Sequence, residues 1–184
     1  MSSTPQVRLQ LPSNPLFLSG AREMVYQFAS RCGFSDESCG QLALAVDEAL
    51  CNVIRHGYGK APDKPIWLSM TFVGGVATPE TQDNNPTEAL RIVIEDEAKQ
   101  VDPTTIKSRD LDEIRPGGLG VHIITEVMDE VRWEKRTDGP IGMRLTMMKK
   151  RVPAGKAGEG EKCADGAAEG SSCGTEGSKG QGAA

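Results

Sequence analysis

The order of the expected elements constrains the fold of this chain more than any other feature of its sequence. Alternating or β-branched segments predict strands at residues 7–11, 66–73, 90–95, 132–135 and 143–149. Apolar residues at helical spacing predict helices at 16–32, 35–56 and 117–131. Most strands follow one another directly and do not alternate with helices one by one. This order favours an α/β two-layer sandwich, with a mixed sheet covered on one face by helices, over a doubly wound parallel sheet.

Residues 153–184 differ in composition from the rest of the chain. They are rich in Gly and Ala and contain no Leu, Ile, Val, Phe, Trp or Tyr. Because such a segment cannot bury enough apolar surface to offset the entropy lost on ordering, we expect a disordered tail. Residues 1–152 then form one domain, which is long enough for a sizeable core.

Charge and hydropathy exclude several classes of function. The formal net charge is −5, which disfavours direct binding to a nucleic-acid duplex. No apolar run approaches the roughly 18 residues of a membrane span, and the first ten residues lack the apolar run of a secretory signal. The five Cys include no CxxC pair and are expected to be reduced thiols rather than disulfides or zinc ligands. Together these features predict a cytoplasmic protein with no membrane partner.

The predicted helix at 35–56 carries two faces of different character. Its expected core stripe consists of four apolar residues: Leu42, Val46, Ala49 and Val53. Glu48 and Asn52 lie one turn apart on another side, together with Arg55. Their side chains offer an oxygen base and an oxygen ligand of the kind that Mg²⁺ prefers. The alternative is an ordinary solvated face on which Arg55 pairs with Glu48. His56, next to this motif, is expected to pack at the helix end.

A glycine cluster, Arg115-Pro-Gly-Gly-Leu-Gly120, directly precedes the last predicted helix. Glycines allow a ligand to approach the backbone closely, and a helix N-terminus presents free N–H groups to an anion. The cluster is therefore compatible with phosphate binding, although its spacing matches neither the P-loop nor the Rossmann pattern. The alternative is a flexible hinge before a helix.

Asp96 follows directly on the hydrophobic strand at 90–95. A carboxylate at a strand end can accept a hydrogen bond from an exocyclic amine such as that of adenine. The alternative is an aspartate that only stabilises a turn.

These three features, in this order, resemble the GHKL ATPase (Bergerat) fold. The match is closer to the bacterial anti-sigma-factor serine/threonine kinases. It is carried by Val46-Asp-Glu-Ala-Leu-Cys-Asn-Val-Ile-Arg-His-Gly-Tyr58 and by Arg115-Pro-Gly-Gly-Leu-Gly-Val-His-Ile-Ile-Thr-Glu-Val-Met-Asp-Glu-Val131. The resemblance covers roughly residues 7–150, nearly all of the predicted domain.

The resemblance implies a role for each matching residue. Glu48 would be the general base, Asn52 would ligate Mg²⁺ on the ATP phosphates, and Asp96 would accept from the adenine amino group. Residues 102–116 would form the ATP lid. The remaining implied nucleotide contacts are Arg115, Gly117, Gly118, Leu119, Gly120 and Val121 at the phosphates and Thr146 near the adenine. One position departs from the family: Ala98 stands where most members carry a glycine that lets the backbone pass close to the base.

The function implied by this resemblance is that of an ATP-dependent protein serine/threonine kinase. Such a protein phosphorylates an anti-anti-sigma (STAS-type) antagonist and binds a sigma factor in alternation, and the resemblance is compatible with a homodimer. Two alternatives remain open from the sequence. One is a nucleotide-gated regulatory module that sequesters a partner without chemistry, and the other is an interaction protein that keeps only the fold.

Overall fold

A computed structural model describes residues 4–76, 87–106 and 119–152. Along the chain, the strands are β1 (Val7–Pro12), β2 (Pro65–Val76), β3 (Thr87–Asp96), β4 (Glu130–Lys135) and β5 (Met143–Lys150). The α-helices are α1 (Leu18–Arg31), α2 (Asp36–Asn52) and α3 (Leu119–Val127). Short turns of helix complete the set: η1 (Pro15–Phe17), η2 (Val53–Gly57) and η3 (Pro103–Thr105). Within this part of the chain, no helix is both long enough and apolar enough to cross a membrane.

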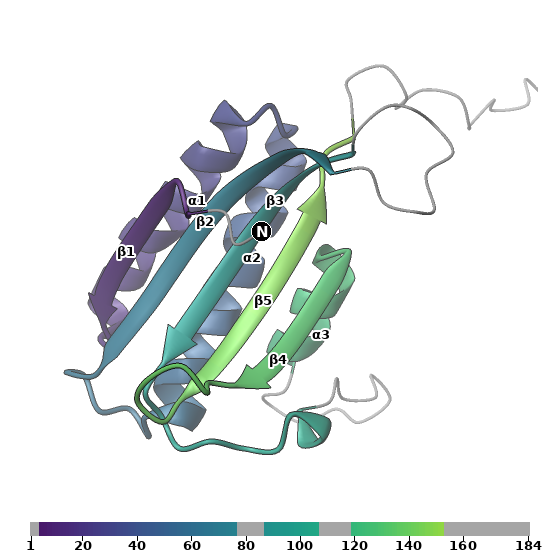
Figure 1. Cartoon of the computed structure of the whole chain (residues 1–184). Helices are drawn as coiled ribbons and strands as arrows, with labels where there is room; N and C mark the ends of the chain where they lie inside the picture. The colour runs from purple at the N-terminus through teal and green to yellow at the C-terminus, as the bar shows by residue number, and fades with distance from the viewer. Residues whose placement is uncertain (1–3, 77–86, 107–118, 153–184) are drawn as a thin grey trace, which may run out of the picture. The chain divides into compact units, whose positions relative to one another are not determined.

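The five strands form one sheet in the order β1-β2-β3-β5-β4, with the helices on one of its faces (Figure 1). The prediction of a two-layer α/β sandwich is confirmed, but the expectation of a mixed sheet is wrong, because all four strand pairings are antiparallel. The reason is the position of β5. It lies between β3 and β4, which run in the same direction and therefore never become neighbours. The chain from β3 through α3 to β4 is thus a split crossover.

The core lies between the sheet and the helices α1 and α2. Alternate residues of the neighbouring strands β2 and β3 are buried on this face, among them Leu68 and Met70 from β2 and Ile92 from β3. Fully burying one such side chain stabilises the fold by about 1.5–3 kcal/mol. The alternation therefore decides which face of the sheet the helices cover.

The core also fixes the rotation of α2 about its axis. Of the apolar stripe predicted on this helix, Leu42, Val46 and Ala49 are buried, whereas Val53 is only half-buried. Because the stripe faces the sheet, the polar residues on the neighbouring side of the helix point toward α3 and not into the core. The direction of Glu48 is thus set by the packing of its apolar neighbours.

The ends of the helices follow local signals in the sequence. Ser35 caps α2, since its Oγ accepts the Ser38 N–H at 3.2 Å, and Gly33 ends α1 with a φ of 81°. The predicted helix at 35–56 is continuous, but its last turn is the π-helical η2, in which the Tyr58 N–H donates to the Val53 carbonyl. Such turns recur at functional sites.

The last predicted helix is shorter than expected. It ends at Val127 rather than near Val131, because β4 begins at Glu130 and pairs with β5. The Asp129 N–H already donates to the Met148 carbonyl at 2.9 Å. Strand pairing with β5 therefore overrides the helical spacing in this segment.

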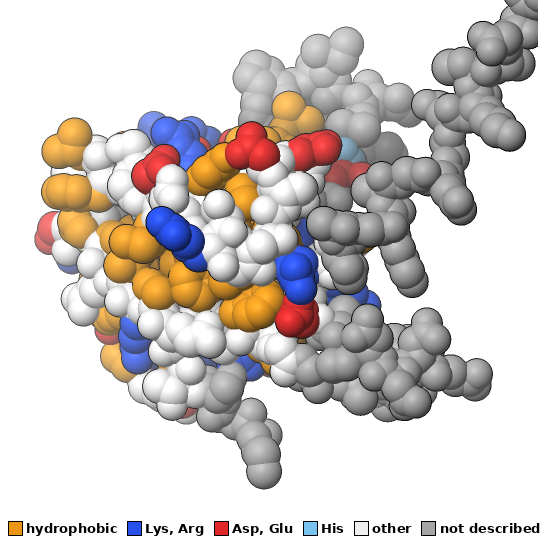
Figure 2. Space-filling view, turned by 90° about the horizontal axis from the view of Figure 1, so that it is seen from above, with side chains coloured by type: hydrophobic (Ala, Val, Ile, Leu, Met, Phe, Trp, Pro, Cys, Tyr) orange, Lys and Arg blue, Asp and Glu red, His pale blue; other side chains and the backbone are white. Residues whose placement is uncertain are grey.

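Figure 2 shows the molecule from above, so that the end at the top of Figure 1 faces the viewer. Hydrophobic side chains gather in the middle of this surface, and acidic and basic side chains are scattered around them. Arg151 and Glu88 form an ion pair that joins the end of β5 to the start of β3. The chain beyond this point, from residue 153 on, lies outside the described residues, and the predicted disorder of the tail stays a prediction.

Candidate functional site

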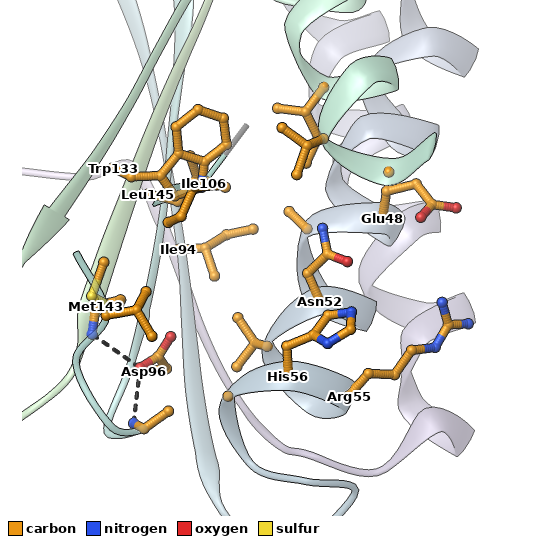
Figure 3. A pocket seen from close by; sticks show the side chains of 18 of the residues that line it. Glu48, Asn52, Arg55, His56, Ile94, Asp96, Ile106, Trp133, Met143 and Leu145 are labelled. Carbon is orange, nitrogen blue, oxygen red and sulfur yellow. Dashed lines mark hydrogen bonds between the residues drawn. The ribbon is translucent and has the colours of Figure 1, made fainter. Parts of the chain in front are cut away.

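A pocket of about 760 Å³ opens between the C-terminal end of α2, the start of α3 and the ends of β3 and β5. Its volume falls in the range of small-molecule sites. Figure 3 shows its two walls: α2 and η2 on one side, and the strand ends with Asp96 on the other. The apolar part of the lining comes mainly from Ile94, Ile106, Trp133, Met143 and Leu145.

Glu48 and Asn52 line one end of this pocket. Their one-turn spacing brings both side chains to the start of α3, where Leu119, Gly120 and Val121 also line the pocket. A Cβ added at Gly120 would lie 2.7 Å from Glu48 Oε2 and 3.3 Å from Asn52 Nδ2. Any side chain at position 120 would therefore collide with Glu48, and the glycine allows the backbone of α3 to lie close to both polar groups.

The alternative pairing of Glu48 with Arg55 is not found. No ion pair joins these two side chains in the part of the chain that the structure describes, and Arg55 is exposed at the pocket rim. His56 was expected to pack at the helix end, but it is exposed and lines the pocket one turn beyond Asn52. The packing interpretation of His56 is therefore wrong.

This end of the pocket offers oxygen groups that suit a hard cation such as Mg²⁺. Asn52 supplies a carboxamide oxygen and Glu48 supplies a carboxylate, and the described start of α3 lies beside them with Leu119, Gly120 and Val121. Mg²⁺ on a nucleotide is held mostly by phosphates and water, with one or two protein oxygens. Such an ion needs no cluster of three or more metal-ligating side chains, and the described residues contain none.

Asp96 forms the opposite end of the pocket and is only 5% exposed. Its Oδ1 accepts the backbone N–H groups of Ala98 at 2.9 Å and of Met143 at 3.0 Å. Within the described chain no group donates to Oδ2, so this oxygen is available to a ligand. Burial raises the pKa of the carboxyl, while the two N–H groups and the positive charge of Arg136 act in the opposite direction.

Ala98, the departure from the family pattern, fits without strain. The φ angle of Ala98 does not lie in the left-handed region. Among the described residues other than glycine, only Lys60 has a positive φ. Its methyl group lies against Gly57, because a Cβ added at Gly57 would be 2.9 Å from the Ala98 Cβ. The glycine at position 57 therefore makes room for the methyl group at position 98.

Tyr58, the last residue of the first motif, holds two segments of the chain together beside the pocket. Its hydroxyl donates to the Pro65 carbonyl at 2.6 Å and accepts the Glu97 N–H at 2.6 Å. Burial is the main cause that raises the pKa of the phenol to about 12. Tyr58 thereby ties the end of η2 to the chain next to Asp96, a contact across the fold that no local pattern in the sequence could reveal.

Gly142 was also missed. A Cβ at this position would lie 1.9 Å from the Asp96 carbonyl oxygen, so only a glycine fits here. This close approach brings the Met143 N–H to the Asp96 carboxylate. The sequence shows a Gly-rich turn at this point but not which strand end the turn approaches.

Not every predicted residue reaches the pocket. Thr146 does not: it alternates along β5 with Leu145 and Met147, which face the helices, and Leu145 lines the pocket instead. Arg115, Gly117 and Gly118 lie outside the described residues, as does most of the predicted lid at 102–116. The roles of these residues stay predictions.

Comparison with known proteins identifies the class to which this fold and pocket belong. A family model of the histidine kinase-like ATPase domain matches residues 11–149. The chain belongs to the histidine kinase-like ATPase family.

Its relatives narrow this class further. The chain is 30% identical over 127 residues to the serine-protein kinase RsbW of Listeria monocytogenes serotype 4a (strain HCC23), a match that covers 69% of this chain and 78% of that protein. It is 26% identical over 155 residues to the serine-protein kinase RsbW of Bacillus subtilis (strain 168), covering 79% and 88%. The chain is thus an RsbW-like member of the family, and the resemblance inferred from its motifs is confirmed.

Two solved structures share the fold. One holds the RsbU and RsbW domains of Rv1364c from Mycobacterium tuberculosis, with a TM-score of 0.52, 16% identity, and coverage of 80% of this chain and 33% of that longer one. The other is the SiaB–SiaC complex from Pseudomonas aeruginosa, with a TM-score of 0.53, 10% identity, and coverage of 78% and 89%. At these identities the likeness concerns the fold alone.

Proposed function

We propose that this protein binds ATP with Mg²⁺ and transfers the γ-phosphoryl group to a serine or threonine of an antagonist protein. In alternation with that antagonist it sequesters a sigma factor. The observation that carries the proposal is the convergence of Glu48, Asn52 and the start of α3 at one end of a pocket whose other end is the buried Asp96.

Each of these groups has a distinct task in this proposal. Asp96 Oδ2 accepts the amino group of adenine, and the apolar walls at Ile94 and Leu145 enclose the base. Asn52 binds the Mg²⁺ that neutralises charge on the phosphates, and the N–H groups at the start of α3 hold the phosphate oxygens.

Glu48 accepts the proton of the attacking hydroxyl in this scheme. Phosphoryl transfer depends mostly on positioning and charge stabilisation, so a single base beside the phosphates is sufficient. The Glu48 carboxylate lies 2.7 Å from the Cβ position of Gly120, beside the proposed phosphate site, which is where such a base must lie. The names of the RsbW relatives, which are serine-protein kinases, support the choice of reaction.

The test is phosphotransfer from labelled ATP to STAS-type antagonist proteins of the same organism. Glu48→Gln keeps the size of the side chain but removes the base, so we expect binding of Mg-ATP to remain and transfer to be lost. Glu37→Gln is the matched control, because Glu37 is an exposed glutamate in the first turn of the same helix. Unchanged transfer in Glu48→Gln would show that the assignment of the base is wrong.

A protein that binds ATP but transfers nothing to any antagonist would instead be a nucleotide-gated binding module. Ala98, which stands where most members carry a glycine, would favour that alternative if its methyl group narrowed the pocket, and the space opposite Gly57 removes this steric reason. The kinase is therefore the function that the pocket supports best.

A further inference from the structure

The contacts behind Asp96 point to a role for Arg136 that the pocket itself does not reveal. Arg136 follows β4 and begins the turn at residues 136–142 that leads into β5. Its side chain is only 11% exposed, and it is not among the residues that line the pocket. A cation buried at this level requires partners. The partners of Arg136 include Asp96 at the end of β3, Trp67 on the adjacent strand β2, and Asp138 in the same turn as Arg136.

Three contacts join the guanidinium to the sheet. Its Nη1 donates to the Asp96 carbonyl oxygen at 2.9 Å. Its Nε lies 3.8 Å from Glu95 Oε1, and its Cζ lies 5.4 Å from the centre of the Trp67 ring. Trp67 and Glu95 are cross-strand partners on the face of the sheet away from the helices. Arg136 therefore contacts Asp96 from behind, while the carboxylate faces the pocket from the front.

The backbone of the same turn is closed on itself and is held by the side chain of Gln100, from the chain that follows β3. The Arg136 N–H donates to the Gly142 carbonyl at 2.9 Å, and Gln100 Nε2 donates to the carbonyl oxygens of both residues at 2.9 and 3.1 Å. This closed turn places Gly142 against Asp96 and directs the Met143 N–H to Oδ1.

We propose that Arg136 is a positioning residue for recognition of the nucleotide base: it holds the 136–142 turn on the end of β3 and so fixes the Asp96 carboxylate in the pocket. The proposal rests on the proposed function, since it assumes that Asp96 contacts the base. Arg136 never touches the nucleotide in this account and acts only through Asp96 and Met143.

A second consequence concerns the charge of the carboxylate. Arg136 lowers the pKa of Asp96 against the larger effect of burial. The other ionisable groups around this carboxylate are its neighbours Glu95 and Glu97, the Tyr58 phenol, and the pocket-lining side chains of Glu48, Arg55, His56 and Lys99. Tyr58, with a pKa of about 12, stays neutral at physiological pH, so Arg136 is the cation that acts on Asp96 from outside the pocket.

Loss of the charge on Arg136 therefore raises the pKa of Asp96 further. If Asp96 is protonated on Oδ2, this oxygen carries a hydrogen and faces the hydrogens of the adenine amino group. Oδ2 then no longer accepts a hydrogen bond from the base. The role of Arg136 thus has a readout in the pH dependence of binding, which a purely structural role would not change.

The experiment measures the Kd of Mg-ATP and of adenosine by calorimetry for the wild-type chain, Arg136→Gln and Arg136→Lys between pH 5 and 8. For Arg136→Gln we expect the affinity for Mg-ATP and for adenosine to fall by the same factor, about tenfold. The hydrogen bond that is weakened joins Asp96 to the base, and both ligands carry the same base. We also expect the loss of binding at acid pH to begin at a higher pH than in the wild type. Arg136→Lys keeps the charge and restores the wild-type pH profile.

The matched control is Arg132→Gln. Arg132 lies on β4, its side chain is 75% exposed, and its ion pair is with Glu134 rather than with the end of β3. We expect wild-type affinity and pH profile from this variant. If Arg136→Gln melts at a lower temperature but its folded fraction binds with the wild-type Kd and pH profile, Arg136 is only structural and the proposal is overturned. If the wild-type chain binds neither ligand, the proposed function fails and this role fails with it.

Discussion

Replacing Asp96 by asparagine separates recognition of the nucleotide from stability of the fold. The amide oxygen of asparagine can still accept the N–H groups of Ala98 and Met143, which Oδ1 accepts at 2.9 and 3.0 Å. The amide nitrogen then takes the place of Oδ2 and presents a donor where the adenine amino group also presents a donor. Asp96→Asn should therefore lose affinity for ATP without losing the contacts that hold the strand end.

The size of the effect follows from the burial of this site. An unmatched buried donor and the loss of a hydrogen bond to a charged group together weaken binding by about 2–4 kcal/mol, or roughly 30- to 700-fold in Kd. Asp96→Ala is different, because it leaves two buried N–H groups without an acceptor and lowers the free energy of unfolding by about 2–6 kcal/mol.

The pH dependence of stability gives a second, independent readout. Because burial raises the pKa of Asp96 above its ordinary value of 3.8, the folded protein binds a proton more tightly here than the unfolded chain does. The tighter proton binding contributes to the free energy of unfolding. That contribution is fully present below the ordinary pKa and is lost as the pH rises through the pKa of the folded state. Asparagine carries no charge to bury, so at pH 7 we expect the Tm of unliganded Asp96→Asn to equal or exceed that of the wild type.

The assay pairs calorimetric titration of ATP with thermal melts at pH 4 and pH 7 for the wild type, Asp96→Asn and Asp96→Ala. Wild-type affinity for ATP in a well-folded Asp96→Asn would refute the assignment of Asp96 to the base. A large fall in its Tm at pH 7 would refute the reasoning about burial.

Three further substitutions test other contacts. Gly57→Ala should weaken ATP binding about tenfold, because its methyl group would meet that of Ala98 at 2.9 Å, and a second change, Ala98→Gly, should restore the Kd. Tyr58→Phe leaves two polar backbone groups without their partner and should lower the free energy of unfolding by about 1–3 kcal/mol in denaturant titrations at pH 7. Gly120→Ala should reduce phosphotransfer by about tenfold or more while the Tm changes little, because its methyl group displaces the Glu48 carboxylate. Each prediction has a result that would contradict it. These results are wild-type affinity for ATP in Gly57→Ala, wild-type stability in Tyr58→Phe, and full phosphotransfer activity in Gly120→Ala.

The sequence was sufficient to predict what depends on local spacing. The core stripe of α2 and the one-turn separation of Glu48 and Asn52 follow from helical periodicity, and the structure places both residues in the pocket. The position of Asp96 at the end of a buried strand follows from the apolar run before it. These parts of the site could be predicted because each lies within one element.

The parts that could not be predicted depend on which elements meet. Thr146 was placed near the base, but the register of β5 between β3 and β4 turns Leu145 to the pocket instead. Tyr58, Gly57 and Gly142 matter because they meet the chain around Asp96 from distant positions in the sequence. No periodicity in one segment can show such a contact, since it arises only when the sheet has assembled.

The most direct test of the central claim is a calorimetric titration of the purified chain with ATP in the presence and absence of Mg²⁺, beside Asn52→Ala. The pocket, with Asn52 at the phosphate end and Asp96 at the base end, predicts binding that requires Mg²⁺ for full affinity and is weakened in the variant. Absence of binding under every condition, or binding that neither Mg²⁺ nor Asn52→Ala changes, would contradict this account of the site.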